Sequence, residues 1–325
     1  MADEKQALKR TILRAYGLIR ADIRRTTLER SEPLSRALGA DVHFKWELEQ
    51  VTGSFKFRGA LHKLRTLPEP ARVRGIVSAS TGNHGLAISH AARLEGVGLT
   101  LFLPRTIAEV KRRKLEAFGV PLRFHGDSCE KTEIAAREHA AGEGRTFVSP
   151  YNDLDIIRGQ GTLAVEAAED LPDLDAVFVP VGGGGLIAGI GAYLKAVRPS
   201  VAVIGVEPEN SAFMDASLRA GRLVEVEEKE TVADAVAGGI EPGSVTFSLC
   251  REVVDRIVTV TEDAIVRAMS LMAQRHGRMA EGAGALALAG LLTAAGDFGG
   301  RRVLCVVSGG NVAPERFRGL TGALP

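Results

Sequence analysis

One charge-free stretch constrains the fold of this chain more than any other segment. Between Ala176 and Leu194 the sequence carries no charged residue, which is nearly enough to cross a bilayer as a helix. Pro180 and the run Gly182 to Gly185 would interrupt such a helix near its middle. A buried strand, a tight turn and a helix explain the whole stretch, so we interpret it as part of a sheet and not as a membrane span.

Similar apolar runs recur along the chain and alternate with amphipathic segments. This βαβ order is typical of parallel sheets covered by helices. We predict an α/β fold with a large parallel-sheet domain, residues 1–68 and 146–325, and a smaller inserted α/β domain, residues 69–145. The predicted strands are 75–79, 98–103, 176–181, 201–206, 256–260 and 303–307, with helices that include 107–118 and 262–276.

The charge balance and the cysteines narrow the range of partners. Because 41 Lys and Arg face 40 Asp and Glu, no long-range field is available to collect nucleic acid or an anionic membrane, and a small molecule is the expected partner. The start, residues 1–5, has acidic charges and no apolar core, which favours a cytoplasmic protein. Cys129, Cys250 and Cys305 lack the close spacing of metal or redox motifs, so we expect small core residues and no metal site.

The glycine run has two chemical interpretations. Backbone N–H groups of Gly182 to Leu186, at the start of a helix, could surround a phosphate, and no Lys-Ser/Thr pair follows to make a nucleotide P-loop. Alternatively, Gly183, Gly185 and Ala188 fit the G-x-G-x-x-A pattern of an NAD-binding oxidoreductase, with Glu207 about 20 residues later for a ribose contact. We favour a bound phosphate group.

Three further segments carry groups suited to catalysis. Lys56 lies between two aromatic residues where an apolar helix pattern begins, and burial would lower its pKa and make it a nucleophile toward an aldehyde. A surface lysine with a buried stem is the simpler alternative. The polar turn 79–85 suits a carboxylate or phenolate, or it merely caps a helix, and Ser308 to Asn311 form another polar turn after a strand.

Taken together, segments 54–60, 80–85, 182–186 and 308–311 resemble the threonine dehydratase and serine racemase family of fold type II pyridoxal-phosphate (PLP) enzymes. The resemblance implies a homodimer in which Lys56 carries PLP as a Schiff base and Phe55 lies against its ring. It also implies phosphate binding by the amides of Gly182, Gly183, Gly184, Gly185 and Leu186, a bond from Asn83 to the ring hydroxyl, Ser308 at the pyridine nitrogen, and a substrate carboxylate held by Ser80, Thr81, Gly82 and His84.

The reaction that the resemblance implies is deamination by dehydration, carried out by a hydro-lyase and ammonia-lyase on a β-hydroxy-α-amino acid. Lys56 would remove the α-proton, and the β-hydroxyl would leave with a proton from the cofactor phosphate. The released enamine would hydrolyse to a 2-oxo acid and ammonia. A neutral serine at the pyridine nitrogen favours this fast elimination over a long-lived carbanion.

Several positions depart from the family pattern. Racemases of the family carry a serine as the acid/base on the opposite cofactor face, where this chain has Thr81. A threonine hydroxyl could still act, so Thr81 is a second catalytic candidate and an amino-acid racemase is the alternative, but the departure makes racemisation the less favoured reaction. Glu207 and Ser211 match a family cation site, but Phe213 stands at the aspartate position, so no metal is expected. Ala235 replaces a usual glycine beside the ring.

Substrate choice stays open at this level. Tyr151 aligns with a segment near the substrate side chain, and 238–240, 246–247 and 281–285 resemble the hydroxyectoine-utilisation or phenylserine dehydratase branch. Serine, threonine, a 3-hydroxy diamino acid and a 3-aryl-serine all remain candidates, because selectivity depends on pocket shape. A PLP-binding regulatory protein without turnover is the non-enzymatic alternative.

Overall fold

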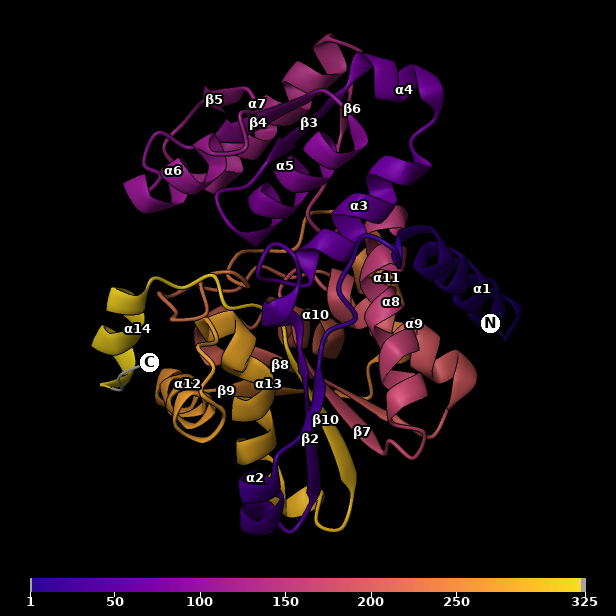
Figure 1. The fold of residues 1–325 in the computed structure, drawn as a ribbon, viewed down its shortest axis with the longest axis vertical. Coiled ribbons are helices and arrows are strands. Elements are labelled where there is room, and N and C mark those ends of the chain that lie inside the picture. The colour runs from indigo at the N-terminus through magenta and orange to yellow at the C-terminus, as the bar shows by residue number, and fades with distance from the viewer. Residues whose placement is uncertain (1, 323–325) are drawn as a thin grey trace.

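The computed structural model describes residues 2–322 and contains two β-sheets (Figure 1). Met1, the first residue of the segment from which we predicted a cytoplasmic protein, lies outside the described residues. The charge-free stretch forms a strand, a glycine turn and a helix, as expected. The prediction of an α/β fold built on parallel sheets is therefore confirmed.

The larger sheet has six strands in the order β1-β2-β10-β7-β8-β9. All neighbours are parallel except β1 and β2, whose antiparallel pairing the sequence patterns did not predict. The strands are β1 (Leu28–Arg30), β2 (Asp41–Trp46), β7 (Ala176–Pro180), β8 (Ala202–Pro208), β9 (Arg256–Val260) and β10 (Arg302–Val307).

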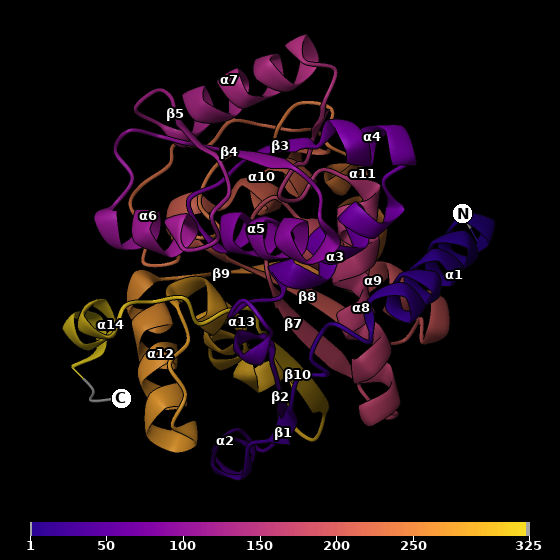
Figure 2. The same cartoon turned by 45° about the horizontal axis from the view of Figure 1, so that its top comes forward.

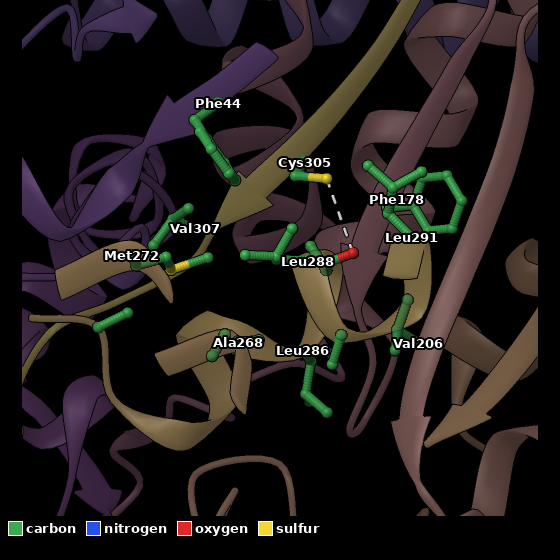
Figure 3. Close-up of a cluster of buried hydrophobic side chains, with 14 of the residues drawn as sticks. Phe44, Phe178, Val206, Ala268, Met272, Leu286, Leu288, Leu291, Cys305 and Val307 are labelled. Carbon is green, nitrogen blue, oxygen red and sulfur yellow. Dashed lines mark hydrogen bonds between the residues drawn. The ribbon is translucent and has the colours of Figure 1, made fainter. Parts of the chain in front are cut away.

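Both faces of the sheet are buried at its centre, which is why β7 and residues 303–307 of β10 are apolar. In β10, Val303, Cys305 and Val307 point toward a core that includes the helix-borne Leu286 and Leu288, shown in Figure 3. Alternate residues of the same strand join the core on the opposite face. The helices around this sheet are α1 (Ala2–Ile19), α2 (Glu32–Leu38), α8 (Leu154–Asp170), α9 (Gly185–Val197), α10 (Phe213–Ala220), α11 (Val245–Val253), α12 (Glu262–His276), α13 (Gly282–Thr293) and α14 (Pro314–Thr321).

The smaller sheet is parallel, with the order β5-β4-β3-β6. Figure 2 shows α5 and α7 on its opposite faces. Its strands are β3 (Ile76–Ala79), β4 (Leu99–Leu103), β5 (Leu122–Phe124) and β6 (Thr146–Phe147), and its helices are α4 (Glu69–Arg74), α5 (Asn83–Glu95), α6 (Glu109–Glu116) and α7 (Cys129–Gly142).

Helix α3 (Lys56–Thr66) connects the two parts of the molecule. Its buried Phe57, Leu61 and Leu64 share a core with α5 and the smaller sheet, and its outer side packs along α8. The helix therefore belongs to both packing units, and the domain boundaries at residues 69 and 145 stay a prediction.

The expectation that all the cysteines are core residues was wrong for one of them. Cys250 and Cys305 are buried, but Cys129 is exposed because it is the first residue of α7, beside the cavity described below. Within residues 2–322, no helix combines the length and the apolarity needed to span a membrane.

Candidate active site

A cavity of about 1480 Å³ lies between the two sheets, and every predicted site residue lines it. Its polar groups follow the carboxyl ends of β3, β7 and β10, where open parallel sheets place their ligands. The structure thus brings together residues that are far apart in the sequence. They are Phe55, Lys56, Ser80, Thr81, Gly82, Asn83, His84, Tyr151, Gly182, Gly183, Gly184, Gly185, Leu186 and Ser308.

Lys56 is the first residue of α3, and its amine faces the cavity without an acidic partner. Nζ donates a hydrogen bond of 2.8 Å to the carbonyl of Pro150 and lies 5.1 Å from the centroid of the Phe55 ring. No carboxylate within residues 2–322 forms an ion pair with it. As the sequence predicted, burial lowers the pKa of Lys56, to about 8. About a tenth of this amine is therefore neutral and nucleophilic at pH 7, far more than for an ordinary lysine.

The glycine loop presents a row of free amides. The loop follows β7, Gly184 has a φ of 84°, and α9 begins at Gly185. Within the described residues, the N–H groups of 182–186 donate to no protein acceptor. Amides at the start of a helix, with its dipole behind them, favour an anion such as a phosphate.

Tyr151 packs against this loop. A Cβ built on Gly183 would fall on the Tyr151 ring, so the loop requires glycine there for close packing. The phenolic oxygen of Tyr151 accepts a 3.0 Å hydrogen bond from the Glu241 amide, and burial raises the pKa of Tyr151 to about 12. The ring is thus a fixed, neutral wall of the cavity.

Ser78 of β3 fixes which ring nitrogen of His84, in α5, carries the hydrogen. Ser78 Oγ donates to the carbonyl of Val148 (2.9 Å) and lies 3.1 Å from His84 Nε2. Because the serine hydrogen is engaged, Nε2 carries the imidazole hydrogen and Nδ1 is an acceptor, which has no hydrogen-bond partner among residues 2–322. Burial, followed by the charge of Lys56, lowers the pKa of His84 to about 3.

Asn83 is held by a buried acid that the sequence analysis did not select. Its Nδ2 donates to Glu281 Oε1 at 2.5 Å, and Glu281 lies at the start of α13. Burial raises the pKa of Glu281 to about 7. Glu281 stands in a segment that we quoted for its family resemblance, but no local signal links it to Asn83, 198 residues away.

Ser308 and Ala235, which the sequence analysis placed beside the cofactor ring, also line the cavity. The Ser308 hydroxyl is buried and donates to the carbonyl of Ala283 at 3.3 Å, so it would have to rotate to donate to a ring nitrogen. Ala235 lines the cavity with its methyl group exposed.

Glu207 accepts hydrogen bonds from the backbone at the start of α10. Its carboxylate accepts hydrogen bonds from the amides of Met214 (2.9 Å) and Asp215 (2.8 Å), and burial raises its pKa to about 8. Glu207 is thus engaged at the start of α10, buried and not among the residues that line the cavity, which leaves the predicted NAD alternative without its ribose contact. Residues 2–322 contain no group of three or more His, Cys, Asp or Glu placed to hold a metal ion.

A buried cluster of four charges lies behind the first turn of α3, and the sequence analysis missed it. Arg58 forms bidentate pairs with Glu47 (both 2.8 Å) and with Glu166 (2.7 and 2.9 Å). Lys45 Nζ lies 2.7 Å from the same Glu166, and all four side chains are 0% exposed. Arg58 is part of the quoted 54–60 segment, yet the other three charges of the cluster come from β2, the following turn and α8.

Known proteins match this chain over nearly its whole length. The model of a family described as pyridoxal-phosphate dependent enzymes matches residues 19–309. An L-threonine ammonia-lyase from Thermotoga maritima is 41% identical over 301 residues, covering 93% of this chain and 75% of the relative. The solved structure of processed threonine deaminase isoform 2 from Solanum lycopersicum has a TM-score of 0.93 at 31% identity, covering 99% of this chain and 94% of that one. Maize serine racemase has a TM-score of 0.89 at 29% identity, covering 94% of each chain.

Proposed function

This chain belongs to the pyridoxal-phosphate dependent enzymes, and we propose that it is an ammonia-lyase that converts a β-hydroxy-α-amino acid into a 2-oxo acid and ammonia. The observation that carries the proposal is the amine of Lys56, which has no ion-pair partner within residues 2–322 and a pKa lowered to about 8, in one cavity with the free amides of the glycine loop. The similarity to threonine ammonia-lyases supports the choice of reaction.

The residues present fit PLP. The amides of 182–186 would hold its phosphate, Phe55 would lie against its ring, and Asn83 would reach the ring oxygen. Ser308 would meet the pyridine nitrogen. When bound, PLP supplies an aldehyde that condenses with amines and a ring that withdraws electrons from the substrate Cα.

The chain's own groups would then orient the substrate and move its proton. Ser80, Thr81 and the amide of Gly82 would hold the carboxylate, and the Lys56 amine would take the proton from Cα. His84 offers an acceptor, not a charged donor, so its part in this cluster would be to receive an N–H or O–H of the ligand. The β-hydroxyl would leave with a proton as one molecule of water, and hydrolysis of the released enamine would consume one, so the net products are the 2-oxo acid and ammonium.

Amino-acid racemisation is the second candidate, favoured by the similarity to a serine racemase and by the Thr81 hydroxyl in the cavity. A racemase must return a proton to Cα from the face opposite Lys56. In threonine the Cβ atom carries a methyl group beside the hydroxyl, which restricts this approach and supports the lyase as the main reaction.

The test is to purify the holoprotein, record its visible absorption, and assay 2-oxo acid and ammonia with serine, threonine, a 3-aryl-serine and a 3-hydroxy diamino acid. Chiral analysis of recovered serine measures racemisation in the same samples. We expect a yellow protein that forms oxo acid and ammonia, and a Lys56→Ala variant that lacks both the colour and the turnover. A yellow wild type that inverts serine without releasing ammonia would favour the racemase, and PLP binding without turnover on any of these compounds would argue for a regulatory role.

The finer assignments are also part of the proposal. Tyr151 would shape the pocket for the substrate side chain as a rigid wall, since its hydroxyl is engaged by the Glu241 amide. The homodimer and the cytoplasmic location stay predictions.

A further inference from the structure

The polar turn that follows β10 contains an asparagine to which the proposed reaction gives no role. Asn311 lines the cavity, and its side-chain amide makes two hydrogen bonds. Nδ2 donates to the carbonyl of Thr52 at 2.8 Å and to Oδ1 of Asn83 at 2.7 Å. One side chain therefore contacts both the loop before Lys56 and the first residue of α5.

The loop before Lys56 and the turn after β10 are joined along their backbones. The Phe55 amide donates to the Ser308 carbonyl and the Gly310 amide to the Gly53 carbonyl, both at 3.0 Å. Gly53 has a φ of 75°, and a Cβ there would lie 2.7 Å from the Asn311 Oδ1. The loop thus requires glycine at a point where Asn311 lies directly against it.

The contact with Asn83 fixes which end of the Asn83 amide faces the cavity. Because Asn311 donates, the Asn83 atom that meets it must be the oxygen. The NH₂ end of Asn83 then turns to the other side, where one hydrogen goes to Glu281. The second hydrogen has no protein acceptor among residues 2–322, so the group that Asn83 offers to a cavity ligand is a donor.

We propose that Asn311 is a positioning residue that holds Asn83 as a hydrogen-bond donor toward the ring oxygen of PLP. The proposal rests on the cofactor placement given above and not on the identity of the substrate. Asn83 is the first residue of α5, which packs on the smaller sheet, whereas Ser308 follows β10 of the larger sheet. Asn311 connects these two parts of the site, because it contacts both Asn83 and the loop before Lys56. A donor at the ring oxygen favours the deprotonated oxygen and lowers its pKa.

The experiment is a double-mutant cycle on PLP binding. Apo-protein is titrated with PLP for the wild type, Asn311→Ala, Asn83→Ala and the double variant, and the bound chromophore is titrated with pH by visible absorption. We expect Asn311→Ala to weaken PLP binding about five- to tenfold and to raise the pH at which the absorption bands interconvert, since about one hydrogen bond is lost. In the Asn83→Ala background the same change should have almost no further effect.

Controls separate positioning from general damage. Asn210→Ala removes another asparagine whose Nδ2 donates to a backbone carbonyl, that of Glu230 at 2.7 Å, but on an exposed loop, and it should change neither readout. Thermal unfolding of each apo-protein identifies a variant that fails to fold, and Asn311→Asp, which preserves size but cannot donate, then takes the place of alanine. An Asn311 effect that is equally large with and without Asn83, or wild-type affinity and pH behaviour in Asn311→Asp, would overturn the proposal. A holoprotein that catalyses a different reaction and releases no ammonia would refute the proposed function. The double-mutant cycle would stay valid, because it measures only PLP binding and the titration of the bound chromophore.

Discussion

Replacing Glu166 by glutamine is expected to destabilise the protein strongly, because it removes one charge from a cluster whose charges balance. Lys45 and Arg58 contribute two positive charges and Glu47 and Glu166 two negative ones, all on side chains that are 0% exposed. Burial alone would raise the pKa of Glu166, but the charges of Arg58 and Lys45 outweigh it and lower the pKa. Glu166→Gln leaves one uncompensated positive charge in the interior.

The size of the loss follows from that imbalance. Breaking a buried ion pair by removing one partner costs about 3–5 kcal/mol, because the remaining charge stays desolvated. An exposed pair such as Arg256–Asp297, with a 2.9 Å contact, is worth about 0–1 kcal/mol, so Asp297→Asn is the matched control. Lys45→Met combined with Glu166→Gln restores neutrality, and we expect it to recover about 2 kcal/mol or more relative to the sum of the two single losses.

The assay is urea unfolding of the wild type, both single variants, the double variant and the control, followed by far-UV circular dichroism and compared at equal m-values. Because Arg58 lies in the first turn of α3, the amplitude of the PLP absorption should fall in Glu166→Gln and recover in the double variant. Losses that add within about 0.5 kcal/mol in the double variant would refute the charge-balance argument, since independent sites behave in that way.

Three further predictions concern the cavity itself. The rate of PLP capture by the apo-protein, followed by stopped-flow absorbance, should rise with pH, because only the neutral amine attacks and burial lowers the pKa of Lys56 from 10.5 to about 8. The rate should be half-maximal near pH 8, and a half-maximal rate near pH 10.5 would contradict this expectation. Gly183→Ala should weaken PLP binding at least tenfold, because the new methyl group falls on the Tyr151 ring. Fluorescence titration measures the affinity. The control Gly296→Ala, whose new methyl group meets nothing within 4 Å, should bind PLP normally. For Glu281, burial raises the folded-state pKa from 4.5 to about 7, so the folded state binds more protons than the unfolded state between these values. The stability of the protein should therefore decline as pH rises through that window. Thermal unfolding of Glu281→Gln should lack this decline, and a pH profile identical to that of the wild type would disprove the assignment to Glu281.

Most strands with two buried faces were predictable from the sequence, but the buried β2 was missed because Asp41, His43 and Lys45 interrupt its apolar residues. The partly exposed β9 was predicted correctly. β7 and residues 303–307 of β10 are apolar because helices cover both sides of their sheet, and this leaves a local signal. β1, β5 and β6 have two or three residues each and include exposed or half-buried positions, so they leave no comparable pattern. The antiparallel β1–β2 pair is also set by the turn through α2, which periodicity does not describe.

The candidate site was predictable at the level of motifs and not at the level of partners. Polar turns at strand ends and the glycine run indicated the cavity, since parallel strands present their carboxyl ends on one edge. The contacts that orient those motifs join residues far apart in the chain, such as Asn83 and Glu281, and no spacing rule predicts them. Cys129 shows the same limit, because its exposure depends on where α7 begins relative to the cavity.

Lys45 and Lys56 show how the distribution of carboxylates separates a structural lysine from a reactive one. Both lie near aromatic residues in apolar sequence, and nothing local distinguishes them. Lys45 meets Glu166 at 2.7 Å, whereas the amine of Lys56 donates to the carbonyl of Pro150, at 2.8 Å, and to no carboxylate in the described part of the chain. A carbonyl dipole offsets less of the desolvation of an ammonium than a full carboxylate charge does, so burial can lower the pKa of Lys56. The same Glu166 also binds Arg58, which keeps that carboxylate behind α3 and away from the cavity. The buried cluster therefore stabilises the helix that begins at Lys56 while leaving its amine without an acidic partner, the condition that nucleophilic attack on an aldehyde requires.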